Sequence, residues 1–162
     1  MTELYYFDNS ATTLKKPAAV AEAVYHAIAD GQLGNPARGS HSASLNALRL
    51  TEALRRKTAV LFGGPDAANV AFTANATASL NLVLKGLLTP ADHIITTVTE
   101  HNAVLRPLYQ LEEQGASISF VGVDECGTLI YPDFSRLLRP DPRAVVVNHA
   151  SNVTGNAADL EW

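Results

Sequence analysis

The stretch HIITTVTEHNAVLRPLYQLEEQGASISFV, residues 93–121, decides the fold. It begins and ends with short apolar runs, 93–98 and 117–121, that contain the β-branched residues common in strands. Between them, residues 103–114 have the composition of a helix, and Gly115 is placed to end it. Strand, helix and strand in this order predict a βαβ unit with two parallel strands.

The same alternation continues on both sides of this unit. Before it, the sequence predicts a strand at 70–73 and a helix at 77–88. After it, the sequence predicts a helix at 132–138 and a strand at 144–148. We therefore expect an α/β fold with a mainly parallel sheet and flanking helices.

Two further helices are predicted near the amino terminus. Pro17 is a good first helical residue for a helix at 18–29 that Gly31 ends. Ser42 or Ser44 is a candidate cap for a second helix extending to about residue 62.

Composition narrows the class of protein. With 47% hydrophobic and 17% charged residues among 162, the chain has material for a core. Since no apolar run approaches about 20 residues, we expect no transmembrane segment, and the mildly acidic charge gives no reason to expect a membrane partner. A net charge of −4 gives no reason to expect nucleic acid. We interpret the single cysteine, Cys126, as a structural or incidental thiol, and we expect a cytoplasmic protein because no signal peptide is visible.

Polar residues follow three of the predicted strands, where ligands bind in parallel sheets. The first cluster, residues 74–79, opens a helix, so it indicates either an anion site or a cap by Asn75 or Thr77. The other two are residues 99–102 and 148–156, for which a surface histidine and ordinary turn chemistry are the simpler interpretations. The histidines and the cysteine show no zinc-ligand spacing, so we expect no metal site. The sequence also contains neither a phosphate-binding loop motif nor a nucleophile-elbow motif.

Five short elements together carry a family likeness: YFDNSATT at 6–13, GNPARGSH at 34–41, FTANATASLN at 72–81, EHNA at 100–103 and HASNVTG at 149–155. With these elements in this order, the chain resembles the amino-terminal part of cysteine desulfurases and related class-V aminotransferase-fold enzymes, which use pyridoxal 5′-phosphate. The resemblance implies a partial fold-type-I large domain. Residues 1–16 would then be a lead-in segment, and residues 17–162 an incomplete cofactor-binding domain that stops before the Schiff-base lysine.

The resemblance also implies roles for individual residues. Ala76 and Thr77 would hold the cofactor phosphate, His101 would stack on the pyridine ring, and Asn152 would hydrogen-bond its phenolic oxygen. Ala78 departs from the family, which usually has glutamate there. A second group of residues would line the mouth of the site or lie near the interface of a homodimer: Ser10, Ala11, Thr12, Arg38 and His41.

The implied activity is removal of sulfur from L-cysteine, a small amino-acid substrate. In the family, the catalytic lysine, the acidic partner of the ring nitrogen and the nucleophilic cysteine all follow the element at 149–155. The chain has four lysines, none of them matching: Lys15, Lys16, Lys57 and Lys85. We therefore expect no catalytic residue in this chain and no activity of it alone.

Two alternatives remain open. One is another class-V enzyme with a different substrate, such as a selenocysteine lyase, an epimerase or a kynureninase-like enzyme. The other is a non-catalytic remnant that acts as an assembly module, with a partner chain or a second copy of itself covering its exposed sheet edge.

Overall fold

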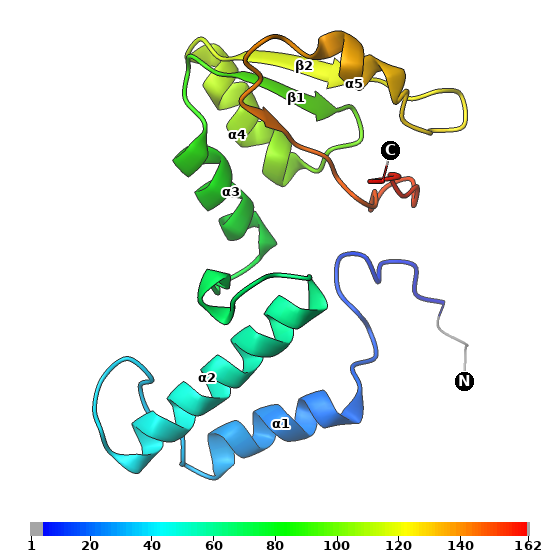
Figure 1. Ribbon diagram of the computed structural model, residues 1–162. Helices are drawn as coiled ribbons and strands as arrows, with labels where there is room; N and C mark the ends of the chain where they lie inside the picture. Colours follow the sequence, from blue (N-terminus) through cyan, green and yellow to red (C-terminus); the bar gives the residue numbers. More distant parts are fainter. Residues whose placement is uncertain (1–4, 162) are drawn as a thin grey trace. The chain divides into compact units, whose positions relative to one another are not determined.

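The computed structural model describes residues 5–161, which divide between Phe72 and Thr73 into two compact units. The carboxy-terminal unit is built on a three-stranded parallel sheet in the order β2-β1-β3 (Figure 1). Its strands are β1 (His93–Thr97), β2 (Ser117–Val121) and β3 (Ala144–Val145). The central strand, β1, is buried along its whole length, as expected for a strand with neighbours on both edges.

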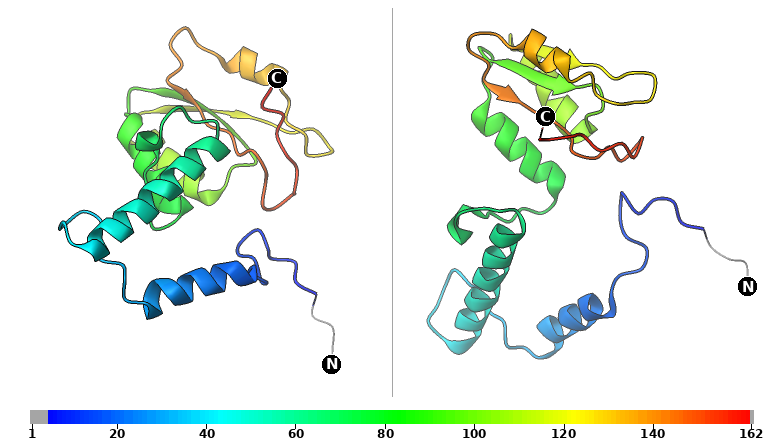
Figure 2. Two further views of the ribbon diagram at one scale, coloured as in Figure 1. Left: turned by 60° about the horizontal axis from the view of Figure 1, so that its bottom comes forward. Right: turned by 45° about the vertical axis from the view of Figure 1, so that its right-hand side comes forward.

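Helices cover both faces of this sheet. α3 (Ala76–Leu87) and α4 (Asn102–Glu113) share one core cluster with the sheet, consisting of Leu84, Leu88, Ile94, Val104, Leu108, Leu111 and Ala116. α5 (Pro132–Leu137) packs against a second cluster on the other face, consisting of Ile95, Val121 and Leu129 (Figure 2). Successive strand side chains point to opposite faces, so neighbouring Ile94 and Ile95 supply different clusters. The predicted α/β fold with a parallel sheet and flanking helices is confirmed.

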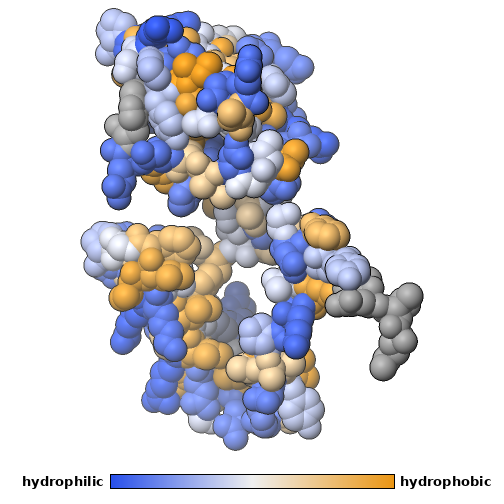
Figure 3. Space-filling view, turned by 90° about the vertical axis from the view of Figure 1, so that its right-hand side faces the viewer, coloured by the Kyte–Doolittle hydropathy of each residue, from blue (hydrophilic) through white to orange (hydrophobic). Residues whose placement is uncertain are grey.

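The amino-terminal unit contains α1 (Ala18–Ala29), α2 (Ser42–Leu61) and a 3₁₀ turn, η1 (Ala67–Asn69). α1 has no buried residue. Large apolar side chains lie exposed on both helices, and part of this apolar surface is visible as orange in Figure 3. They include Val20, Val24, Ile28, Leu48, Leu54, Val60 and Leu61. The helical pattern of the sequence therefore produces helices here without a buried core of the size found in the other unit.

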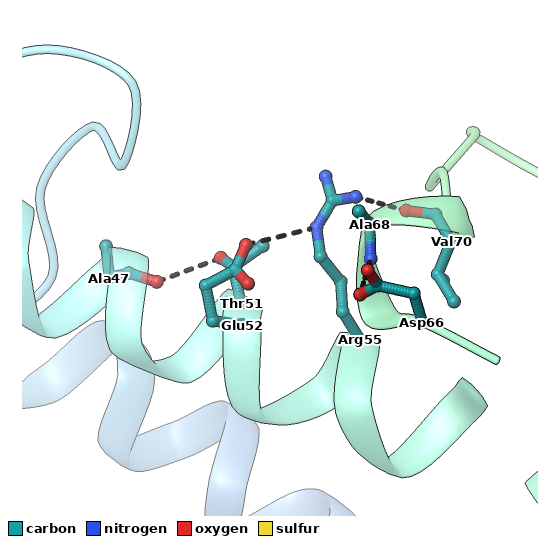
Figure 4. Close-up of polar contacts among 7 residues, drawn as sticks. All are labelled: Ala47, Thr51, Glu52, Arg55, Asp66, Ala68 and Val70. Carbon is teal, nitrogen blue, oxygen red and sulfur yellow. Dashed lines mark hydrogen bonds and ion pairs between the residues drawn. The ribbon is translucent and has the colours of Figure 1, made fainter. Parts of the chain in front are cut away.

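Arg55 ties α2 to the segment that follows η1 (Figure 4). Its Nη1 donates to the Val70 carbonyl, and its Nε lies 3.5 Å from Glu52 Oε1. The guanidinium carbon lies 5.2 Å from the centroid of the Phe72 ring, a cation–π geometry. Residues 70–73 form no strand, which corrects the prediction from sequence. The physical reason is that these residues pair with no strand among the described residues. The Val70 carbonyl instead accepts a hydrogen bond from the Arg55 side chain.

Element bounds otherwise follow the sequence closely. The helix at 18–29 and the strand at 117–121 have the predicted limits. β3 is shorter than the predicted 144–148, because its pairing with β1 ends soon after the Val146 N–H donates to the Ile95 carbonyl. α2 is capped by His41, whose Nδ1 accepts from the Ser44 N–H at 3.4 Å, and neither Ser42 nor Ser44 is the cap. Within residues 5–161, no helix combines the length and the apolar character needed to cross a membrane.

Gly127 occupies a turn that only glycine fits well. Its φ is +78°, and an added Cβ would lie 2.6 Å from Asn156 Nδ2. We expect Gly127→Ala to lower the free energy of unfolding by about 1–3 kcal/mol. The matched control is Gly86→Ala in α3, where an added Cβ meets nothing within 4 Å. A helical alanine there should raise the same free energy by up to about 1 kcal/mol. Urea unfolding measures both, and a stable Gly127→Ala variant would contradict this account of the turn.

Candidate cofactor site

The amino terminus of α3 keeps free backbone donors. Asn75 caps the helix, because its Oδ1 accepts from the Ala78 N–H at 2.8 Å. The cap leaves the N–H groups of Ala76 and Thr77 without an acceptor in the part of the chain that the structure describes. Asn75, rather than Thr77, is therefore the capping residue, and the two free N–H groups are available to an anion.

Thr77 and His101 line the same pocket, a hollow of about 370 Å³ between α3 and α4. Two cations, Lys85 and Arg106, share its lining, and no carboxylate does. The remaining polar groups are the side-chain amides of Asn81, Asn102 and Gln110. Cations, amide donors and an exposed helix terminus give the pocket the chemistry of an anion site. The residues present therefore fit the phosphate end of the predicted cofactor.

His101 is held in place by the helix that it begins. It is the N-cap of α4, and its Nδ1 accepts from the Ala103 N–H at 3.0 Å. Because Nδ1 acts as an acceptor, the proton of the neutral imidazole lies on Nε2. The cap fixes the ring while leaving the side chain exposed at the pocket. A fixed exposed ring suits the stacking role that the family resemblance implies.

Asn152 lies in a tight loop after β3 and apart from this pocket's lining. The loop is fastened by Ser151, whose Oγ accepts from the N–H groups of Val153 and Thr154 at 3.3 and 3.2 Å. The Ala158 N–H also donates to the His149 carbonyl at 2.7 Å. The Asn152 side chain is exposed and makes no hydrogen bond within residues 5–161. The structure thus brings Thr77 and His101 to one pocket and leaves Asn152 outside it.

The other predicted residues lie in the amino-terminal unit. Ser10, Ala11 and Thr12 form an exposed turn in which the Asp8 carbonyl accepts from the N–H groups of Ala11 and Thr12 at 3.2 and 3.3 Å. Arg38 and His41 meet around buried Ser44: its Oγ donates to the Arg38 carbonyl at 2.8 Å and lies 3.0 Å from His41 Nε2. Hydrogen bonds within each segment therefore hold the turn at 8–12 and the loop at 38–44.

A second hollow of about 310 Å³ lies beside the ends of β1 and β3. Cys126 lines it together with Thr99, Asn148, Ser151 and Asn156. The thiol is exposed and free, in a turn where Asp124 Oδ1 accepts from the Cys126 N–H at 2.9 Å. Among residues 5–161, no group of three or more histidine, cysteine or acidic side chains is placed to hold a metal ion.

The sequence patterns assigned no role of its own to Glu100, which directly precedes His101. Its side chain is only 9% exposed. The carboxylate Oε1 accepts from the Asn148 N–H at 2.5 Å and from Thr97 Oγ1 at 3.0 Å. Burial raises the pKa of Glu100 above its usual 4.5, and these two hydrogen bonds offset only part of that rise. The available signal in the sequence was an acidic residue three positions after the last residue of a buried strand.

The raised pKa of Glu100 predicts a pH dependence of stability. The folded state holds the proton more tightly than the unfolded state, so this group stabilises the fold most at low pH. That contribution is lost as the pH rises from about 4.5 through the folded-state pKa. We expect wild type to lose stability relative to Glu100→Gln across this window. Urea unfolding of both proteins from pH 4 to pH 8 measures the difference, and a flat or inverted difference would contradict it.

Comparison with known proteins places residues 5–162 within the family model described as aminotransferase class-V. Cysteine desulfurase IscS of Psychromonas ingrahamii is 33% identical over 159 residues, covering 96% of this chain and 39% of the relative. The crystal structure of cysteine desulfurase CsdA from Escherichia coli matches with a TM-score of 0.74 and 31% identity, over 94% of this chain and 39% of that one. A structure of SspA in complex with cysteine matches with a TM-score of 0.86 and 26% identity, over 96% and 45%. The chain thus spans about 39% of the length of the curated relatives that it matches.

Proposed function

Because the chain belongs to the class-V aminotransferase family, we propose that it is the amino-terminal part of a cysteine desulfurase. The observation that carries the proposal is the pocket shared by Thr77 and His101, in a chain 33% identical to a cysteine desulfurase. In this proposal, residues 1–16 are a lead-in segment and residues 17–162 contribute to the cofactor-binding domain. The substrate is L-cysteine, and the whole protein is a cytoplasmic homodimer.

The residues of this chain would bind one end of pyridoxal 5′-phosphate. The free N–H groups of Ala76 and Thr77, with the Thr77 hydroxyl, hold the phosphate through hydrogen bonds. The His101 ring, fixed by its hydrogen bond from Ala103, stacks on the pyridine. Asn152, on the loop after β3 and outside this pocket's lining, would hydrogen-bond the phenolic oxygen as the resemblance implies. When bound, the cofactor supplies an electron sink for reaction at the amino-acid substrate.

We expect this chain alone to release no sulfide from L-cysteine. In the family, a lysine beyond the element at 149–155 carries the cofactor, and none of the four lysines here matches it. The assay adds pyridoxal 5′-phosphate and L-cysteine to the purified chain and measures sulfide and alanine. Sustained turnover by the chain would overturn the proposed inactivity.

The substrate is tested on the protein encoded by the complete reading frame. L-Cysteine, L-selenocysteine and L-kynurenine are supplied in parallel, and products are measured for each. Sulfide and alanine from L-cysteine support the proposed desulfurase. Turnover of selenocysteine or kynurenine without turnover of cysteine would identify one of the related class-V activities instead.

A non-catalytic assembly module is a second candidate, favoured by the free edge of β3. Within the described residues, β3 pairs on one side only, and Val145 is 50% exposed. An apolar hollow of about 500 Å³ adjoins this strand and α3. If the reading frame ends at residue 162 and the chain forms a stable complex without binding the cofactor, this candidate replaces the desulfurase.

A further inference from the structure

Glu100 joins two loops that the strand pairing does not join. The hydrogen bonds between the β1 and β3 backbones reach the Val146 N–H, which donates to the Ile95 carbonyl at 2.9 Å. Beyond that point, the segments that follow β1 and β3 continue as separate loops, 98–101 and 148–158. The Thr96 hydroxyl still reaches across, donating to the Val146 carbonyl at 3.1 Å. Between the loops themselves, the connection is the Asn148 N–H donating to Glu100 Oε1 at 2.5 Å. Asn148 Nδ2 adds a longer contact to the Thr99 carbonyl at 3.4 Å.

The Glu100 carboxylate also accepts a hydrogen bond from β1, the strand that precedes it. Thr97 Oγ1 donates to the same Oε1 at 3.0 Å, and Thr97 and Thr99 hydroxyls lie 3.0 Å apart. Thr97 is fully buried in β1 and Glu100 is 9% exposed, so water has little access to compete for these contacts.

We propose that Glu100 is a positioning residue for the cofactor: its Oε1 fixes the spacing between the loop that carries His101 and the loop that carries Asn152. This inference rests on the proposed function, which assigns both residues to the cofactor. Glu100 is adjacent to His101 in sequence, and Asn148 precedes Asn152 by four residues. One oxygen therefore connects the two segments close to the side chains that they present. Glu100 itself touches neither substrate nor cofactor in this proposal.

Two substitutions separate positioning from charge. Glu100→Gln keeps a carbonyl oxygen at Oε1 and can accept both hydrogen bonds, whereas Glu100→Ala removes the acceptor. Glu113→Ala is the matched control, since Glu113 is an exposed acidic residue of α4. All variants are made in the full chain.

The first measurement needs no cofactor. Amide hydrogen exchange by NMR should show about tenfold or greater loss of protection at Asn148 in Glu100→Ala. Amide resonances of both loops should shift, while those of Ile94 and Ile95 stay in place. Glu100→Gln and Glu113→Ala should resemble wild type.

The second measurement uses pyridoxine 5′-phosphate, which has an alcohol in place of the aldehyde and cannot react with lysines. Its dissociation constant should rise several-fold in Glu100→Ala and stay near the wild-type value in Glu100→Gln. Retained Asn148 protection in Glu100→Ala, or loss of it in Glu100→Gln, would overturn the positioning role. If wild type binds no pyridoxine 5′-phosphate, the proposed cofactor site of this chain fails, while the exchange data still decide whether Glu100 fixes the loops.

Discussion

Replacing Leu108 with alanine should lower the free energy of unfolding of the carboxy-terminal unit by about 3–4 kcal/mol. Leu108 is fully buried on α4, in the core cluster between α3, α4 and the sheet. The substitution removes apolar contacts and leaves a cavity that tightly packed neighbours fill only in part. Urea unfolding followed by far-ultraviolet circular dichroism measures the change.

Leu82→Ala provides the matched control for this prediction. Leu82 lies on α3 and is 65% exposed, so its truncation should change the same free energy by less than about 0.5 kcal/mol. Equal effects of the two substitutions would mean that the cluster around Leu108 is not the core of this unit.

Replacing His101 with asparagine should weaken binding of pyridoxine 5′-phosphate by about three- to tenfold. Asparagine is a favourable N-cap, so α4 keeps its capping interaction while the stacking ring is lost. His101→Ala should weaken binding at least as much and also cost about 1 kcal/mol of stability through loss of the cap. NMR titration gives the dissociation constants, and urea unfolding gives the stabilities.

The control for His101 is another exposed histidine. His26→Asn alters a surface residue of α1, 3.3 Å from Asp30, whose exposed ion pair contributes little. Its dissociation constant should equal that of wild type. If His101→Asn binds pyridoxine 5′-phosphate as tightly as His26→Asn does, His101 does not stack on the ligand.

Most of the fold could be predicted because the apolar pattern of each segment is local. The βαβ unit at 93–121 and the helix at 18–29 follow from such patterns. The segment 70–73 has an equally apolar composition but forms no strand, because a strand also requires a neighbour and Arg55 takes the Val70 carbonyl instead. Helix starts were harder to predict. His41 and His101 cap α2 and α4, while general preferences favour serine, threonine, aspartate or asparagine.

Some residues of the candidate site could likewise be predicted from local sequence, whereas others depend on contacts between distant segments. The sequence indicated Thr77 and His101 through their places after predicted strands and in family motifs, and the structure places both at one pocket. The role of Glu100 could not be predicted, because its partner Asn148 lies 48 residues away and the contact depends on how β1 and β3 pair. The placement of Asn152 depends on hydrogen bonds that the Val153 and Thr154 N–H groups donate to Ser151 Oγ, and composition does not specify them.

The most direct test of the central claim is an NMR titration of the wild-type chain with pyridoxine 5′-phosphate, and with pyridoxine as the phosphate-free control. We predict saturable shifts at the amides of Ala76 and Thr77 and at the His101 ring, with a dissociation constant of about 1 mM or below. Pyridoxine should shift the same resonances far less, because the phosphate is the group that the free N–H donors bind. Absence of saturable shifts at these three residues, or equal binding of pyridoxine, would contradict the claim that this chain carries the phosphate end of a pyridoxal-phosphate site.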